Sequence, residues 1–245
     1  MLSIKQLRQE KSYVRPYHWL MQDKLSQEGR LYFGYIDYCV TQVNNYSGRI
    51  LDAGCGDGRL LGEIYSVSKI KKELYGVDYS TNAIEFARLF VPEATFIQAD
   101  LIKLPYEDNF FDVIFLVEVL EHFRPDDIPK ILRELSRIIK KDGRLIITVP
   151  SILMGLPGVQ SKHYQHFTPK TLSDTLNGYF VISNLSGQYK TGWSFLKVLY
   201  RLIDNKLFDI KILRKWYNKN IWPRYFNICK PKDGMRLISV CSPCK

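Results

Sequence analysis

The sequence predicts an α/β fold in which helices cover both faces of a mostly parallel, doubly wound sheet. Between residues 49 and 150, short apolar segments alternate with segments whose apolar residues recur at helical spacing. Such alternation is typical of strand–helix–strand units, in which the strands run parallel. A glycine-rich turn at 54–58 follows the first apolar segment, as in folds that bind a nucleotide at the carboxyl ends of their strands.

Five strands and three helices account for the pattern in this part of the chain. The strands are expected at 49–53, 73–79, 94–100, 111–120 and 143–150. The helices between them are expected at 58–69, 81–91 and 125–141. Ser80 is a suitable N-cap for the second helix, and the almost continuous apolar run at 111–120 is what a buried parallel strand requires.

The segment before the first strand is expected to be helical. Its apolar residues recur at helical spacing, with a break near Gly29. The aromatic triplet Tyr17, His18 and Trp19 is a candidate lid or substrate contact over the strand ends. The same triplet would also suit an ordinary core contact.

The chain after the fifth strand closes the sheet. A loop follows Pro150, a short helix begins at its N-cap Thr168, and two further strands are expected at 179–189 and 235–242, for a seven-stranded sheet. The predicted divisions are a lid (1–48), a core (49–189), an insertion (190–230) and a last strand (231–245).

Composition limits the class of protein. Apolar residues make up 46% of the 245 residues, which excludes global disorder, and no run of 18 or more apolar residues is present. The N-terminus lacks the apolar segment of a signal peptide, so we expect a cytoplasmic protein, with peripheral contact to the inner face of a membrane as an alternative. The five cysteines do not predict disulfides, and the Cys241–Cys244 pair lacks a second pair for a structural zinc site.

The predicted strand ends deliver glycine or a carboxylate to one edge of the sheet. The 54–58 turn, Asp78, Asp100 and Glu118 each follow or end a different strand. Because the carboxyl ends of parallel strands meet at one edge, these groups should share a ligand site.

The glycine turn itself discriminates between nucleotides. Its third glycine comes one residue earlier than in the dinucleotide fingerprint, where Arg59 now stands, and no phosphate-loop lysine follows. The acidic Asp52 and Asp57 make the turn a poor cradle for phosphates. They suit a ligand that carries an ammonium and a sulfonium group.

Three stretches resemble the class I S-adenosylmethionine (SAM)-dependent methyltransferases: LDAGCGDG, GVDYS and QADLIKLPYEDNFFDVIFLVEVLEHF. The resemblance covers about residues 48–150 and is closest to a broad subgroup that includes ubiquinone-biosynthesis O-methyltransferases and many small-molecule, sugar and lipid methyltransferases. It implies a Rossmann-like fold and SAM as cofactor, with S-adenosylhomocysteine as product. It also implies that Asp78 binds both ribose hydroxyls, that Asp100 and Leu101 flank the adenine, and that the backbone near Leu116–Glu118 faces the methionine part.

The full candidate cofactor site contains Asp52, Gly54, Cys55, Gly56, Gly58, Asp78, Tyr79, Asp100, Leu101, Val117 and Glu118. Some of these residues have structural alternatives. Asp100 could stabilise a turn, and Glu118 at the end of a buried strand could be ion-paired instead. A nucleotide-dependent oxidoreductase and a SAM-binding protein without catalysis remain the competing functions.

Histidines are the candidate catalytic groups, because an oxygen acceptor gains from a nearby base at neutral pH. His163 and His166 lie in the loop after the fifth strand, and His122 follows the fourth. Each could also serve only to fix its loop. The i, i+3 spacing of His163 and His166 could seat a metal, but no third ligand is evident, so none is expected. We expect O-methylation of a quinol, phenol or lipid-linked sugar, with N-methylation of an amine as the alternative.

The insertion is the most individual part of the chain. Residues 190–230 contain ten Lys or Arg and two Asp, and nine aromatic residues including Trp193, Trp216 and Trp222. An amphipathic, basic and tryptophan-rich segment is typical of a helix at a membrane interface. A nucleic-acid contact and a helical subdomain packed on its own sheet are the alternatives.

Overall fold

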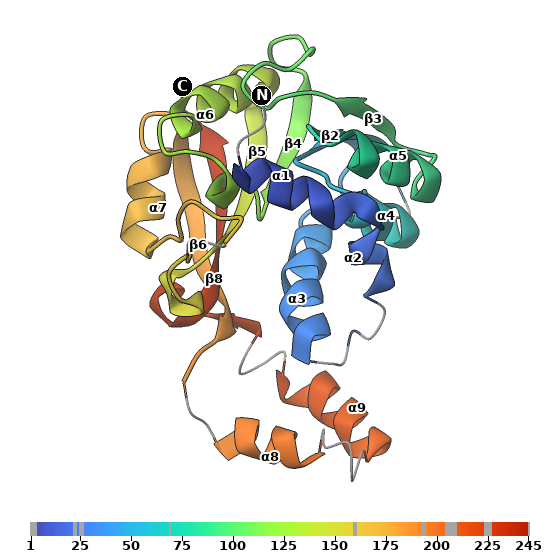
Figure 1. Cartoon of the computed structure of the whole chain (residues 1–245), viewed down its shortest axis with the longest axis vertical. Coiled ribbons are helices and arrows are strands. Elements are labelled where there is room, and N and C mark those ends of the chain that lie inside the picture. Colours follow the sequence, from blue (N-terminus) through green and yellow to red (C-terminus); the bar gives the residue numbers. More distant parts are fainter. Residues whose placement is uncertain are drawn as a thin grey trace.

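The computed structural model shows one mixed sheet covered by helices (Figure 1). The structure describes residues 4–21, 24, 27–68, 70–158, 161–192, 195–203, 210–222 and 227–244. Trp193, one of the tryptophans of the predicted membrane-facing segment, lies outside the described residues.

The sheet has the strand order β3-β2-β1-β4-β5-β8-β6-β7. The first five strands pair in parallel, and β8 joins β5 and β6 in antiparallel pairing. Their bounds are β1 Gly48–Ala53, β2 Lys72–Asp78, β3 Thr95–Gln98, β4 Phe111–Val117, β5 Ile139–Pro150, β6 Phe180–Lys190, β7 Ile228–Cys229 and β8 Gly234–Pro243. The order reverses between β1 and β4, and a ligand crevice is expected at such a switch point.

Helices cover both faces of the sheet, as predicted. The helices α3 (Gln27–Thr41), α4 (Arg59–Val67) and α5 (Thr81–Phe90) bury apolar residues against one face. The helices α6 (Ile128–Ile138) and α7 (Pro169–Leu176) cover the other. The two cores share the strands β1, β4 and β5, whose residues alternate between the faces.

Two details of the predicted sheet are wrong. The described part of the chain forms eight strands rather than seven, because the two residues of β7 pair with Gly187 and Gln188 of β6. The strand predicted at 111–120 ends at Val117, and a short 3-10 turn, η2 (Leu120–His122), follows it. The apolar run continues past Val117 because Val119 and Leu120 are also buried, so hydropathy alone could not locate the end of the strand.

The N-terminal segment folds as short helices: α1 (Ile4–Glu10), η1 (Lys11–Val14) and α2 (Tyr17–Leu20), which precede α3. In Figure 1, α1 crosses in front of the strand ends.

Helices α8 (Phe195–Ile203) and α9 (Lys211–Asn220) of the insertion lie beyond the lower end of α3 in the same view. Tyr217 of α9 is fully buried and packs with Tyr189 and Trp222. No helix among the described residues is long and apolar enough to span a membrane.

Candidate functional site

The glycine turn joins β1 to α4 through backbone conformations that favour glycine. Gly54, Gly56 and Gly58 have φ angles of +83°, +52° and +80°. The amides of Gly54 and Cys55 donate hydrogen bonds to the carbonyl oxygen of Val77 on β2, at 2.7 and 2.9 Å. These bonds fix the turn against the end of the neighbouring strand.

Gly58 has a different role from the other two glycines. It directly precedes α4, and a Cβ atom placed on it would lie 3.1 Å from Cβ of Ala87 on α5. This glycine therefore permits close packing of α4 and α5. Among the described residues, it lines neither of the two cavities found at this edge.

Asp78 ends β2 and braces the glycine turn. Its carboxylate accepts hydrogen bonds from the amides of Gly56 and Ser80, both at 2.9 Å. Burial raises the pKa of Asp78 to about 6, although these backbone donors oppose the shift. Ser80 accepts a hydrogen bond from the amide of Ala83 at 3.1 Å, which confirms the predicted N-cap of α5.

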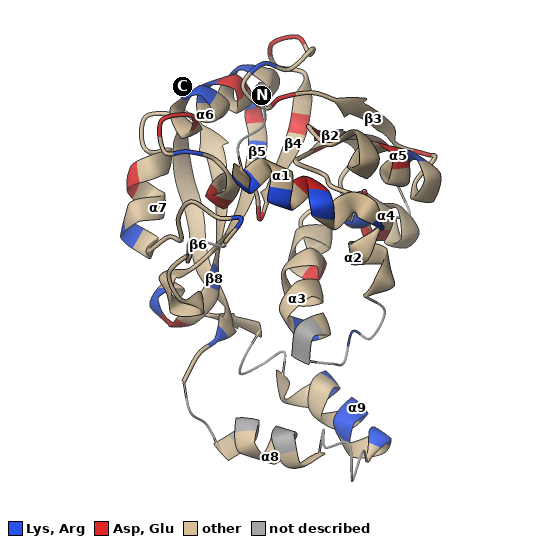
Figure 2. Ribbon diagram, viewed as in Figure 1, with Lys and Arg blue, Asp and Glu red and all other residues tan. Residues whose placement is uncertain are grey.

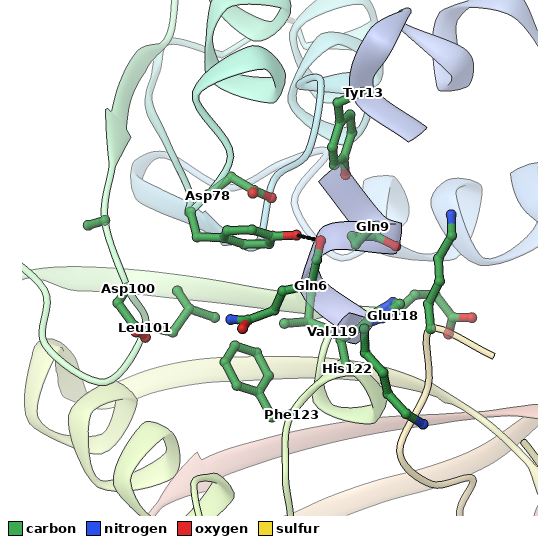
Figure 3. A pocket seen from close by; sticks show the side chains of 15 residues that line it. Gln6, Gln9, Tyr13, Asp78, Asp100, Leu101, Glu118, Val119, His122 and Phe123 are labelled. Carbon is green, nitrogen blue, oxygen red and sulfur yellow. Dashed lines mark hydrogen bonds between the residues drawn. The ribbon is translucent and has the colours of Figure 1, made fainter. Parts of the chain in front are cut away.

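A first cavity opens beside Asp78 (Figure 3). Six predicted cofactor residues line it, together with His122: Gly54, Asp78, Tyr79, Asp100, Leu101 and Glu118. They come from the ends of β1, β2, β3 and β4, so the predicted convergence of strand ends is confirmed. Half of the remaining lining residues come from the N-terminal helices: Lys5, Gln6, Gln9 and Tyr13.

A second cavity adjoins the first and shares Gly54, Glu118 and His122 with it. Its lining adds four predicted cofactor residues, namely Asp52, Cys55, Gly56 and Val117. It also includes Tyr17, His18 and His163, whereas Trp19 and His166, both described, do not line it. The wall is rich in tyrosine: Tyr13, Tyr17, Tyr32 and Tyr35 all contribute.

The N-terminal helices are fastened over both cavities. The hydroxyl of Tyr79 donates to the carbonyl oxygen of Gln6 at 3.2 Å, and that of Ser80 donates to Glu10 Oε1 at 3.0 Å. Lys5 Nζ donates to the carbonyl oxygen of His163, and Lys162 Nζ donates to Ser12 Oγ. This role of α1 and η1 could not be predicted, because their polar residues show no motif.

Asp57 anchors the N-terminal helices and lines neither cavity. Its carboxylate is fully buried and accepts hydrogen bonds from the backbone amide of His18 at 3.1 Å and from its imidazole Nδ1 at 2.8 Å. Trp19 Nε1 donates to the Asp57 carbonyl oxygen at 2.8 Å and stacks on Phe90. By contrast, Asp52 lines the second cavity, and burial with the charge of Asp78 raises its pKa to about 8.

Glu118 follows β4 with a left-handed backbone conformation, at φ +55°. Its carboxylate accepts a hydrogen bond from Thr148 Oγ1 at 3.0 Å and pairs with Arg236 Nε of β8 at 2.7 Å. The ion-paired alternative for Glu118 is therefore present in the structure. The same residue also lines both cavities, so the two roles are compatible.

Two of the candidate catalytic histidines, His122 and His163, meet at one corner of the second cavity. The rings of His122 and His163 lie edge to face, with centroids 4.7 Å apart. His163 Nδ1 lies 2.8 Å from His166 Nε2, and His166 Nδ1 contacts the carbonyl oxygen of Gly155. Burial lowers the pKa of His122 to about 3 and that of His163 to about 4, helped by the neighbouring imidazoles. Glu121, which the sequence analysis did not single out, completes this corner.

The comparisons with known proteins agree with this geometry. Residues 51–147 match the family model described as a methyltransferase domain. A probable S-adenosylmethionine-dependent methyltransferase of Mycobacterium tuberculosis is 28% identical over 132 residues, which cover 54% of this chain and 46% of that relative. A 2-phytyl-1,4-naphtoquinone methyltransferase of Trichormus variabilis is 32% identical over 103 residues, or 40% of this chain and 44% of that relative.

Residues 51–147 are a class I SAM-dependent methyltransferase domain. The chain spans less than half the length of these two curated relatives. A solved structure, the PH0226 protein of Pyrococcus horikoshii, shares the fold of the methyltransferase domain and of its flanking segments. It superposes with a TM-score of 0.60 at 17% identity, over 93% of this chain and 99% of the other. The cofactor of the methyltransferase domain is SAM.

Proposed function

We propose that the protein transfers the SAM methyl group to a hydroxyl oxygen of a small or lipid-like acceptor. The acceptor oxygen gives up its proton and attacks the methyl carbon. The C–S bond breaks with its electron pair going to sulfur, so that neutral S-adenosylhomocysteine leaves. The protein supplies position and a site for the proton, while the cofactor carries the reactive group. The observation that carries the proposal is the pair of adjoining cavities, one lined by strand-end carboxylates and the other by histidines.

The first cavity suits the nucleoside part of SAM. Asp78 would accept hydrogen bonds from both ribose hydroxyls, and Asp100 and Leu101 would flank the adenine. Gly54 and Glu118 line both cavities, so the methionine part and its sulfonium would lie where the cavities join. Asp52 lies on the acceptor side of this junction and suits the cationic end of the ligand.

The second cavity suits the acceptor. Four tyrosines contribute to its wall, and aromatic side chains favour contact with a planar or apolar ring. The naphthoquinone named for one relative is of this chemical kind. His122, which lines both cavities, and His163, which lines the second, provide nitrogen atoms near which an acceptor hydroxyl could lose its proton.

The hydrogen bonds of the loop fix the tautomer of His163. The Gly155 carbonyl oxygen can only accept, so His166 Nδ1 is the donor, and neutral His166 presents a lone pair on Nε2. His163 Nδ1 must then donate to His166 Nε2. The remaining lone pair of neutral His163 is therefore on Nε2.

Calorimetry and turnover test the proposal together. SAM should bind the purified chain, and NADH should not. Asp78→Ala should weaken SAM binding by about 10- to 150-fold, because a charge-assisted hydrogen bond contributes about 1.5–3 kcal/mol. Asp174→Ala on the surface of α7 is the matched control and should bind SAM normally. Tight NADH binding without SAM binding would falsify the cofactor assignment, and SAM binding without turnover on any hydroxyl or amine acceptor would leave a binding protein.

We further propose that α8 and α9 contact an anionic membrane surface. Between Ile210 and Trp222, α9 and its ends contain four basic residues and no acidic one, and Figure 2 marks the positions of basic residues along this helix in blue. Large apolar side chains are exposed beside them, with Ile212 81% and Trp216 54% accessible. This combination favours the interface between lipid headgroups and acyl chains.

Sedimentation with liposomes tests the membrane contact. The chain should bind anionic and not neutral vesicles, and binding should weaken at high salt, because each basic residue near the surface contributes about 1 kcal/mol. Trp216→Ala and Lys215→Glu should each reduce binding, whereas Lys170→Glu on the exposed face of α7 should not. Trp222 is unsuitable for this test because it is buried with Tyr217. Salt-sensitive binding to RNA without vesicle binding would assign the surface to nucleic acid instead.

A further inference from the structure

We infer that Glu121, His122 and His163 bind a divalent metal ion of the zinc class in the wall of the second cavity, which is the proposed acceptor cavity. One carboxylate oxygen and one nitrogen from each imidazole lie within 4.8 Å of one another. All three residues line this cavity. The amide of Tyr164 donates to the Glu121 carbonyl oxygen at 2.7 Å, which holds the two loops together.

Glu121 has a buried carboxylate with one unpartnered oxygen among the described residues. It is 1% exposed, and among the described residues its Oε2 has no hydrogen-bond partner. The nearest basic nitrogen, His122 Nε2, lies 4.0 Å from Oε1, which is too long for a hydrogen bond. His122 Nδ1 is likewise buried with no partner in the described part of the chain. A buried carboxylate in this position is costly unless a cation or a proton neutralises it.

The third ligand is oriented for the same role. The lone pair of His163 is on Nε2, because His166 and the Gly155 carbonyl oxygen fix its tautomer through hydrogen bonds. Metal-binding histidines are commonly held in this way, with the other ring nitrogen donating to a neighbouring acceptor. His166 is thus a positioning residue and not a ligand.

The ligand set favours zinc over harder cations. Two imidazoles and one carboxylate form a three-ligand set that leaves a position open in catalytic zinc sites. Magnesium and calcium prefer sites made of oxygen ligands. With metal–ligand bonds of about 2.1 Å, tetrahedral ligand atoms lie about 3.4 Å apart, so rotations of the side chains must close the group by about 1.4 Å.

The metal would also take part in the proposed methyl transfer. Only this role, and not metal binding itself, rests on the proposed function. An open fourth position toward the cavity would take the acceptor oxygen and lower the pKa of its hydroxyl. The proton would leave to solvent, and the acceptor oxygen would attack the methyl carbon of SAM while the C–S bond breaks with its electron pair going to sulfur. Deprotonation of the acceptor hydroxyl would then not depend on His122 or His163, whose lowered pKa values make them weak bases.

Metal binding can be measured without turnover. We expect the chelator-treated full chain to bind one Zn²⁺ by calorimetry, and Co²⁺ at the same site to give visible absorption bands of a tetrahedral complex. Glu121→Gln and His163→Ala should abolish this binding. His166→Ala should weaken it by about 10- to 100-fold, as for other residues that orient ligands. Glu107→Gln, an exposed carboxylate, and Cys244→Ser, an exposed thiol, are matched controls that should still bind one ion.

The outcomes separate the metal site from the proposed function. SAM affinity and circular dichroism show whether each variant is folded. Unchanged Zn²⁺ binding in folded Glu121→Gln and His163→Ala overturns the inference, as does the absence of binding in the wild-type chain. One bound Zn²⁺ that depends on these residues, in a protein that methylates no acceptor, would support the site and contradict the function. Full methyl transfer by metal-free protein would contradict the metal's role in activating the acceptor.

Discussion

The ion pair between Glu118 and Arg236 should be a main determinant of stability, because it joins β8 to the end of β4. Arg236 Nε lies 2.7 Å from Glu118 Oε2, and its Nη1 donates to the Leu31 carbonyl oxygen at 2.9 Å. The guanidinium also lies 4.6 Å from the ring centroid of Tyr35. The two charged side chains are only 10% and 19% exposed. Arg236→Met would leave Glu118 without a counter-ion in this environment.

Removing one partner of a buried pair destabilises a protein by about 3–5 kcal/mol, and we expect the lower end here because Glu118 keeps some solvent contact. Urea unfolding of Arg236→Met, Glu118→Gln and the double variant gives the coupling energy, which should be about 1.5–3 kcal/mol. The exposed pair Lys170–Asp174 on α7 is the control and should couple by about 0.3–0.5 kcal/mol. If the Glu118 and Arg236 substitutions are additive within about 0.5 kcal/mol, the pair does not stabilise the fold as argued.

Three further predictions concern the turn, the lid and the pH dependence. Gly58→Ala should lower the free energy of unfolding by about 1–3 kcal/mol, because φ is +80° and its Cβ would lie 3.1 Å from that of Ala87; an unchanged urea midpoint would contradict this. Trp19→Phe removes the hydrogen bond to the Asp57 carbonyl oxygen and should cost about 1 kcal/mol of lid stability, seen as faster amide exchange in residues 4–20, and equal exchange would show that the bond contributes nothing. SAM affinity should fall as pH drops below about 6, because the pKa of Asp78 is raised to about 6 and the protonated carboxyl cannot accept two ribose hydrogen bonds. A SAM affinity that does not change between pH 5 and 7 would contradict the ribose role of Asp78. The same shift means that the folded state binds this proton more tightly than the unfolded chain, so the contribution of Asp78 to stability should decrease as pH rises from about 4 to about 6.

The part of the candidate site that we propose binds SAM could be predicted because its information is local. Each strand end carries its own residue, and the parallel arrangement brings Asp78, Asp100 and the glycine turn together without further knowledge. The capping role of Ser80 follows from the same local logic, and its hydrogen bond to Ala83 confirms it. The motif predicted a cofactor contact for Gly58, because this residue belongs to the glycine turn. In the structure Gly58 lets α5 approach α4 closely instead.

The lid could be predicted only in part. The aromatic triplet marked the segment, and the structure divides its members, since Tyr17 and His18 line a cavity while Trp19 packs between α4 and Phe90. Nothing in the sequence indicated that Asp57 would bind His18 and not a cofactor. That pairing depends on where a separate helix docks, which spacing along the chain does not specify.

The cluster of Glu121, His122 and His163 could be predicted only from the order of the strands in the sheet. The i, i+3 spacing of His163 and His166 indicated two possible metal ligands and no third, because the other candidate ligands follow a different strand. In the fold, β4 and β5 are neighbours, so the turn after β4 and the loop after β5 leave the sheet side by side. This adjacency places Glu121 and His122 against His163. His166 lies behind His163 and accepts a hydrogen bond from it. The cluster therefore depends on two adjacent strand ends. A sequence predicts such a cluster only when the residues that follow neighbouring parallel strands are considered together.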